Sequence, residues 1–346
     1  MSDYSNSSDN NSTLYNNTET NGTLGNVIDV DRDYGGDLAG AIASANAGST
    51  IELGNKTYST DGITIDKNLT INGNGGSVIN GNGTSGTIMT LTPGASGTTI
   101  KNVEVTNGNN GIYGNGATNV TLDNLDVNNI GLNQTRRHGV NNSGITFFRA
   151  DGLKIRNSKI QNIGRKGVGV GDTNGAEISG LTVSDVNLAA QHAQSHDAAG
   201  VKFYNTNNAA IRGSYFSDIN AFNIWNDTTS NTTIEGNTID NVGEDFLAPG
   251  FNTNVNIAGI YDEKASNSRV KNNSGTSVGR FLVFDATEFS SQSIDFSDNN
   301  FSSYELGSQD YWFNEQAEKL IATTENPGDA NFNAVASEYY GQANIG

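Results

Sequence analysis

The chain has 346 residues, no cysteine and a formal net charge of −18 at pH 7. The lack of cysteine excludes disulfides, thiolate metal sites and a cysteine nucleophile, and the negative charge disfavours binding to nucleic acid or anionic membranes. No apolar run is as long as a membrane-spanning helix and the first residues do not resemble a signal segment, so we expect no membrane insertion and identify no export signal.

The first predicted elements form an entry to a larger structure. Residues 1–26 are rich in Asn, Ser and Thr and are expected to be disordered, because they offer little apolar surface to bury. Residues 37–48, DLAGAIASANAG, predict a short capping helix that ends at Gly48. Strands are predicted in GITI (62–65), NLTINGN (68–74), SVING (77–81) and TIKNVEV (99–105).

A repeat then occupies the middle of the chain. Six stretches of 21 residues, starting at positions 111, 144, 167, 200, 223 and 259, align without a gap. Their second and twelfth positions are always aliphatic, and their seventeenth and twentieth are aliphatic or aromatic except at Gly275. A fixed period of this kind is typical of a solenoid. The leucine-rich repeat is a rival, but its Leu spacing is missing.

Each unit contains three short strands, near positions 2–5, 10–13 and 16–20, separated by bends with Gly or Asn. The sequence therefore predicts an all-β fold, a right-handed parallel β-helix with three strands per coil, over residues 27–304. Residues 305–346 are predicted to form a C-terminal capping segment. Bends and stacked amide ladders are expected at Asn157, Asn162, Asn237 and Asn241.

Side chains that face outward from the first strand of each unit form a candidate site. If position 2 points into the core, positions 3 and 5 point outward. Coils stack about 4.8 Å apart, so one patch should contain Lys202, Trp225, Asp227, Tyr261 and Glu263. Position 4 changes from Phe203 to Asn226 and Asp262 in successive units, which leaves open whether the inward parity fails there.

Long connectors occur at every second coil, at 132–143, 188–199 and 244–258. Each leads into position 1 of a unit, so it should border the outward patch and wall a groove. Loops held by a rigid scaffold often carry binding and catalytic residues. The three histidines of the chain, His138, His192 and His196, lie in the first two connectors.

Positive charge is concentrated between residues 133 and 166, which contain eight of the 19 basic residues. A guanidinium on a loop above the groove can bind a carboxylate or sulfate, although a solvated basic loop is the alternative. Two basic connectors near the patch imply an anionic ligand. The residues predicted to bind substrate are Arg136, Arg137 and His138 in the connector 132–143, Arg165 and Lys166 in the connector 165–166, His192 in the connector 188–199, and Trp225 and Asp227 of the outward patch.

Two segments carry a resemblance to known families. Residues 41–83 resemble the N-terminal part of pectin-lyase-like β-helix proteins. Residues 200–227 followed by 259–273 resemble a bacterial group of right-handed β-helix repeat proteins, related to polysaccharide lyases and mannuronan epimerases, and residues 325–337 look like its closing segment. The similarity covers roughly residues 36–300 and indicates fold more than substrate.

The resemblance extends to particular residues. The group tends to have Gly-x-Lys-Phe, Trp-x-Asp and Gly-Ile-x-x-Glu, matched here at Lys202, at Trp225 with Asp227, and at Glu263. The chain lacks the paired aspartates of polygalacturonase-type hydrolases. It also lacks the Asp-Pro-His element of alginate epimerases, which Asp197 after His196 resembles only weakly.

Lyases and C5-epimerases of acidic polysaccharides remove a proton beside a carboxylate, so they need a base, a neutralising cation and a proton donor. We assign Lys202 as base or carboxylate neutraliser; alternatively it covers apolar surface. Further catalytic candidates are Tyr204, Tyr261, His196 and Glu263. Trp225 is either a sugar-stacking platform or packs beneath the connector at 244–258.

Asp197, Asp227 and Glu263 are candidate ligands of Ca²⁺, a hard cation that takes six to eight oxygens. The sequence thus predicts an extracellular or cell-surface monomer that acts on an anionic, uronate-containing polysaccharide as a lyase or C5-epimerase. The alternatives are a non-catalytic glycan-binding or adhesive protein, a purely structural solenoid, and a glycoside hydrolase that uses Asp227 and Glu263.

Overall fold

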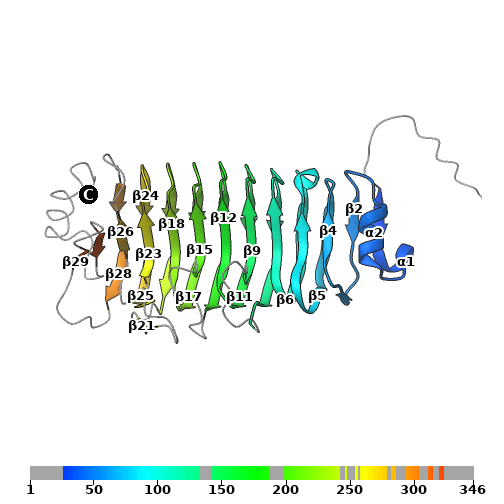
Figure 1. Ribbon diagram of the computed structural model, residues 1–346, viewed down its shortest axis with the longest axis horizontal. Coiled ribbons are helices and arrows are strands. Elements are labelled where there is room, and N and C mark those ends of the chain that lie inside the picture. Colours follow the sequence, from blue (N-terminus) through cyan, green and yellow to red (C-terminus); the bar gives the residue numbers. More distant parts are fainter. Residues whose placement is uncertain are drawn as a thin grey trace, which may run out of the picture.

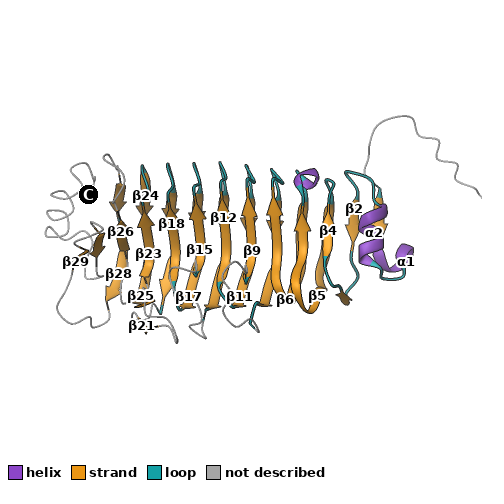
Figure 2. Cartoon of the chain, in the orientation of Figure 1, coloured by secondary structure: helices purple, strands orange, loops and turns teal. Residues whose placement is uncertain are grey.

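The structure is a computed structural model that describes residues 26–132, 142–187, 198–241, 246–247, 254–255, 258–278, 282–285, 294–303, 311–314 and 319–322. It confirms the predicted right-handed parallel β-helix, in which successive coils stack along one axis (Figure 1). Helices are confined to the N-terminal part of the described chain (Figure 2).

Three parallel faces make up each coil, and we number them in chain order within the repeat. Face 1, from positions 2–5, contains β4 (Ile63–Ile65), the ends of β5 (Thr70–Leu91) and β6 (Thr99–Asn115), β9 (Ser143–Phe148), β12 (Lys166–Gly171), β15 (Ala199–Tyr204), β18 (Phe222–Asp227), β23 (Ala258–Glu263) and β26 (Leu282–Asp285).

Face 2, from positions 10–13, contains β1 (Val27–Asp29), β2 (Thr50–Glu52), the starts of β5 and β6, β7 (Thr121–Asp123), β10 (Lys154–Arg156), β13 (Glu177–Ser179), β16 (Ala210–Arg212), β19 (Thr233–Glu235), β24 (Ser268–Lys271) and β27 (Ile294–Ser297).

Face 3 contains β3 (Thr57–Ser59), the middle of β5 and β6, β8 (Asp126–Ile130), β11 (Lys159–Ile163), β14 (Thr182–Val186), β17 (Tyr215–Ile219), β20 (Thr238–Asp240), β25 (Ser274–Val278) and β28 (Asn300–Ser303).

The remaining elements lie at the ends and beside the coils. They are α1 (Val30–Tyr34), α2 (Leu38–Ser44), the single-turn helix η1 (Pro93–Ala95), the antiparallel pair β21 (Phe246–Leu247) and β22 (Asn254–Val255), and the strands β29 (Tyr311–Asn314) and β30 (Lys319–Ala322). β30 pairs antiparallel with β26 and β29, so it is added to the last coil against the parallel order.

Helix α2 is the predicted N-terminal cap. Asp37 accepts a hydrogen bond from the Gly40 amide at its start, and Leu38 and Ile42 are buried on the end of the core. The helix ends at Ser44, because Ala45 is already extended; Gly48, where the sequence placed its end, has a φ of 82° in the turn that follows. Burying these two aliphatic side chains covers the open end of the solenoid.

The predicted inward columns form the core. Ile145, Val168 and Val201 at position 2 and Ile155 and Ile178 at position 12 are at most 1% exposed, and each pairs in register with its neighbour in the next coil. Identical spacing of aliphatic side chains in every coil lets each layer pack on the layer below, so the repeat is the direct cause of the stacking.

Left-handed residues make the bends between the strands. Position 14, between faces 2 and 3, is Asn124, Asn157 or Gly180 in successive coils, with φ between 51° and 61°. Asn and Gly tolerate this conformation best. Asn162 has the same conformation and donates to Asn129 one coil away, which is a rung of the predicted amide ladder.

A polar cluster replaces apolar residues in the core of the later coils. Asn226 and Asp262 at position 4 still point inward and are 0% and 2% exposed, so the parity does not fail there. Asn226 Nδ2 donates to Asp262 Oδ1 over 2.6 Å and to Ser268 Oγ over 3.2 Å. Burial raises the pKa of Asp262 to about 6, although its hydrogen bonds to Asn226 and Ser268 oppose the shift.

We expect Asp262 to make the free energy of unfolding depend on pH. Its pKa is higher in the folded state than the ordinary 3.8, so its contribution is complete below 3.8 and is lost as pH rises through about 6. The difference between these values corresponds to roughly 3 kcal/mol. Urea unfolding at acidic and mildly alkaline pH should show a smaller pH dependence for Asp262→Asn than for the parent; equal dependence would contradict this account.

Candidate functional site

Face 1 presents the predicted patch on neighbouring strands. Lys202 on β15 pairs in register with Gly169 on β12 and with Trp225 on β18, and Trp225 pairs with Tyr261 on β23. In the position 5 column, Tyr204 is followed by Asp227 and Glu263. The strands therefore bring together the outward residues that the repeat predicted.

Lys202 is the centre of this patch. Its side chain is 6% exposed, and its Nζ lies 2.8 Å from Asp227 Oδ2 and 3.3 Å from the centroid of the Trp225 ring. The Tyr204 ring is further away, with its centroid 5.7 Å from the same nitrogen. The ion pair and the indole face hold Lys202 in one position as a cation.

An aromatic cluster outside the main core supports Lys202. It consists of Ala199, Phe222, Trp225 and Tyr261. Phe222 stacks on Tyr261 with ring centroids 4.3 Å apart, and Trp225 Nε1 donates to Glu263 Oε2 over 3.0 Å. Trp225 is 4% exposed, so its ring is covered by its neighbours and the structure favours packing over the predicted sugar-stacking platform.

A pocket of about 230 Å³ opens beside Lys202. It is lined by Phe148, Lys166, Gly169, Val170, Lys202, Tyr204 and Asp227. A Cβ atom on Gly169 would lie 2.6 Å from Lys166 Cε, and one on Gly171 would lie 2.6 Å from the Phe148 ring. The two glycines therefore leave the space into which Lys166 and Phe148 lean. Two lysines, one aspartate and two aromatic rings surround one small pocket.

The lining of the pocket includes one of the binding residues predicted at 165–166 and not the other. Lys166 lines it, as an anionic ligand would require, whereas Arg165 is buried but does not line it. Phe148, Gly169 and Gly171 were not predicted as site residues. The sequence does contain a sign of the pocket. Among the six units, only the one that begins at 167 has glycine at both outward positions, 3 and 5.

Filling the pocket should reduce ligand binding without unfolding the protein. We expect Gly169→Val to weaken binding of an anionic ligand about tenfold or more, because its side chain displaces the flexible end of Lys166. Its melting temperature should stay close to that of the parent. Isothermal titration with a uronate oligosaccharide measures the first effect, and Thr146→Val, in the same column one coil earlier, is the matched control. Unchanged affinity of Gly169→Val would contradict the assignment.

Several predicted residues lie outside the described part of the chain, so their roles stay predictions. They are Arg136, Arg137, His138, His192, His196 and Asp197. Tyr261 is described and 1% exposed, and it packs on Phe222 instead of opening into the pocket. Among the described catalytic candidates, Lys202 and Tyr204 line the pocket, whereas Tyr261 and Glu263 do not.

The predicted Ca²⁺ ligands that the structure describes are engaged in other contacts. Asp227 faces the Lys202 ammonium, and Glu263 accepts from the Trp225 indole. No group of three or more His, Cys, Asp or Glu side chains suited to a metal occurs among the described residues. A Ca²⁺ site takes six to eight oxygens, and the third candidate ligand, Asp197, lies outside the described residues, so the site stays a prediction.

The geometry defines a right-handed parallel β-helix protein with a charged pocket on one face. A family model described as "Right handed beta helix region" matches residues 138–308. Together with the three parallel faces and the left-handed bends, this match shows that the chain has the fold of right-handed parallel β-helix proteins. No curated protein matches it, and no described helix is long and apolar enough to cross a membrane.

Solved structures share the fold at low identity. An alginate lyase from Paenibacillus sp. str. FPU-7 has a TM-score of 0.56 at 17% identity, over 78% of this chain and 93% of that chain. The catalytic domain of a GH87 alpha-1,3-glucanase has 0.53 at 12%, over 82% and 59%. The enzymatically active domain of bacteriophage CBA120 tailspike protein 2 has 0.50 at 13%, over 78% and 50%, so this chain spans half of that domain.

Proposed function

We propose that the pocket binds the carboxylate of a uronate in an anionic polysaccharide, and that the protein cleaves or epimerises this polymer by proton abstraction. The observation that carries the proposal is the pairing of Lys166 and Lys202 around one pocket next to the half-exposed Tyr204. Two lysines against the single carboxylate of Asp227 leave the pocket with a net positive charge, and the rings of Phe148 and Tyr204 can pack on the apolar face of a sugar.

The proposed chemistry begins with charge neutralisation. Lys166 and Lys202 hold the carboxylate, which makes the neighbouring C5 proton easier to remove. We assign the exchange of that proton to Tyr204, which lines the pocket, and His196 is a further candidate outside the described residues. In a lyase, the C5–H electron pair forms the new double bond while the C4–O bond breaks and its oxygen takes a proton. In an epimerase, a proton returns to C5 from the opposite side.

The comparisons support the wider setting of this proposal. Proteins of the same fold include an alginate lyase, a glucanase and a tailspike domain with enzymatic activity, so the fold is used on carbohydrate polymers by others. A polymer substrate in turn suits an extracellular or cell-surface location and a monomer with an open groove. These points remain parts of the proposal.

The test uses alginate, pectate and glycosaminoglycans as separate substrates, each with Ca²⁺ and with a chelator. A lyase increases the ultraviolet absorbance of unsaturated uronate products, and an epimerase changes the NMR spectrum of the uronate units. A flat absorbance trace with an unchanged spectrum for every polymer would contradict both forms of the proposal. New reducing ends without unsaturated product would instead indicate a glycoside hydrolase.

Binding without catalysis is the second candidate. The close contacts of Lys202 with Asp227 and the Trp225 ring favour it, because a nitrogen already held between a carboxylate and an indole is better placed to bind a ligand than to move a proton. This candidate predicts retention on immobilised polyuronate with no change in the polymer. Retention that survives Lys202→Met would remove the pocket from the binding surface in either case.

A further inference from the structure

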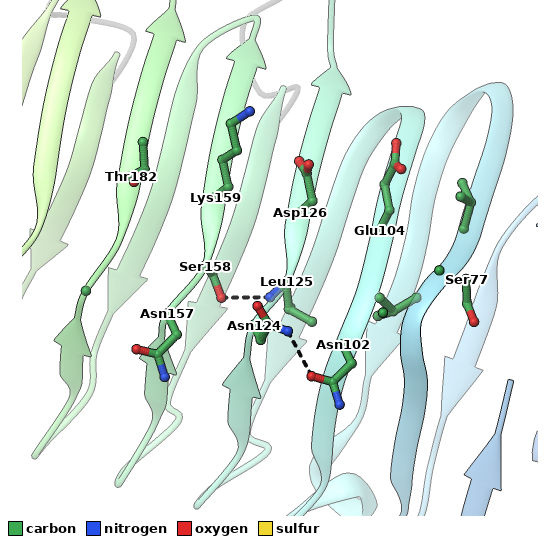
Figure 3. Close-up of a pocket in the computed structure, with 15 residues that line it drawn as sticks. Ser77, Asn102, Glu104, Asn124, Leu125, Asp126, Asn157, Ser158, Lys159 and Thr182 are labelled. Carbon is green, nitrogen blue, oxygen red and sulfur yellow. Dashed lines mark hydrogen bonds between the residues drawn. The ribbon is translucent and has the colours of Figure 1, made fainter. Parts of the chain in front are cut away.

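A second and larger groove lies on a different part of the solenoid. It has a volume of about 710 Å³ and follows the bend between faces 2 and 3 over five successive coils, from Gly75 to Thr182. Figure 3 shows its two rows of side chains: Asn102, Asn124 and Asn157 on one side, and Glu104, Asp126, Lys159 and Thr182 on the other. No residue of the pocket on face 1 lines it.

The amide row is held in place by contacts between coils. Asn102 Nδ2 donates to Asn72 Oδ1 and Asn124 Nδ2 donates to Asn102 Oδ1, each over 2.9 Å, while Asn157 Nδ2 donates to Asp123 Oδ1 over 3.0 Å. Each of these three amides therefore uses one N–H in a hydrogen bond to a residue of the preceding coil. Fixed amides that repeat about every 4.8 Å form a rigid row of donors and acceptors, which reduces the entropy lost on binding.

The charged row is short and nearly neutral. Asn128 Nδ2 donates to Glu104 Oε1 over 3.0 Å and to Asp126 Oδ1 over 2.9 Å, which fixes these two carboxylates next to each other. Lys159, exposed, follows Asp126 in the same column one coil later. Two carboxylates and one ammonium give this row a small negative charge, so a polyuronate would be repelled here.

An exposed aromatic ring continues the charged row. Thr182 lines the end of the groove and pairs in register with Tyr215 on the next coil. Tyr215 is 39% exposed, one of few large apolar side chains that the described residues expose to this extent. Tyr215 does not line the groove but extends the charged row by one coil. An exposed ring at the end of a row of amides, carboxylates and hydroxyls suits a sugar, because the ring packs on the apolar face while the polar groups pair with hydroxyls.

We propose that this groove binds an uncharged polysaccharide lying parallel to the solenoid axis. The spacing of the coils is close to the length of one pyranose unit in an extended chain, so one sugar can meet one set of Asn and outward side chains per coil. The site is independent of the proposed uronate pocket, since it lies on other faces, and it takes the opposite class of polymer. It would hold the protein on a neutral glycan while face 1 remains open.

Affinity electrophoresis of the parent protein in gels that contain galactomannan, xylan or mixed-linkage β-glucan tests the proposal. We expect at least one of these polymers to retard the protein. Tyr215→Ala and Lys159→Ala should each weaken that binding about tenfold or more. Lys154→Ala is the matched control, because Lys154 is an exposed lysine of the same coil that does not line the groove.

A blocking variant separates loss of contact from loss of folding. Thr182→Arg places a long side chain in the groove, whereas Thr238→Arg changes the same column two coils further on and outside it. Thr182→Arg should abolish retardation and Thr238→Arg should not, with similar melting temperatures. No retardation by any of the three neutral polymers, or retardation that Thr182→Arg leaves intact, would overturn the proposal. Gly169→Val, which fills the pocket on face 1 and should keep a melting temperature close to that of the parent, should leave the retardation unchanged, so this result is separate from the fate of the uronate pocket.

Discussion

Lys202→Met is expected to lower turnover of the uronate polymer roughly 100- to 1,000-fold, the usual effect of removing one group that stabilises charge in a transition state. Methionine keeps the apolar part of the side chain but removes the cation that lies 2.8 Å from Asp227 and faces the pocket. Initial rates at several substrate concentrations would show the loss. Lys154→Met, at an exposed position on face 2, should leave the rate unchanged.

The same substitution is expected to destabilise the protein, because it leaves the Asp227 carboxylate without its ammonium partner. Breaking a buried ion pair from one side costs roughly 3–5 kcal/mol, and the side chain of Asp227 is only 13% exposed. The double variant Lys202→Met with Asp227→Asn removes both charges and should recover much of this stability. Recovery of stability without recovery of turnover would show that the activity loss is chemical. A double variant with parental turnover would contradict the role of Lys202.

Tyr204→Phe is expected to separate binding from chemistry. The ring is 47% exposed at the pocket, so its loss of one hydroxyl should leave packing and affinity nearly unchanged. If Tyr204 transfers the proton, kcat falls roughly 100- to 10,000-fold, the range for general acid–base groups, while KM changes little. Tyr34→Phe, in the N-terminal cap, is the control. A parental kcat in Tyr204→Phe would assign proton transfer to another residue, with His196 the next candidate.

The fold was predictable because its physical signal is repeated in every coil. Aliphatic side chains at positions 2 and 12 recur at a fixed spacing, and each is buried in the structure. A single misread unit would not have changed the conclusion. The outward columns were equally predictable, since parity along a short strand follows once one inward position is known.

The site was predictable only in part. Lys202 was predicted as base or carboxylate neutraliser and Lys166 as a residue that binds substrate, and both line one pocket. The shape of the pocket depends on the absence of side chains at Gly169 and Gly171. Glycine carries no reactive group, so neither position stood out in the sequence as a candidate site residue. The burial of Trp225 was also hidden, because it depends on Phe222, a residue that precedes the aligned unit.

The most direct test of the central claim is a crystal structure of the Tyr204→Phe variant with a uronate oligosaccharide, since this variant should bind without turnover. The account predicts one sugar carboxylate within hydrogen-bonding distance of both Lys166 Nζ and Lys202 Nζ, with the pyranose ring against Phe148 over the two glycines. An oligosaccharide bound elsewhere, or bound in this pocket with its carboxylate directed away from both lysines, would contradict it.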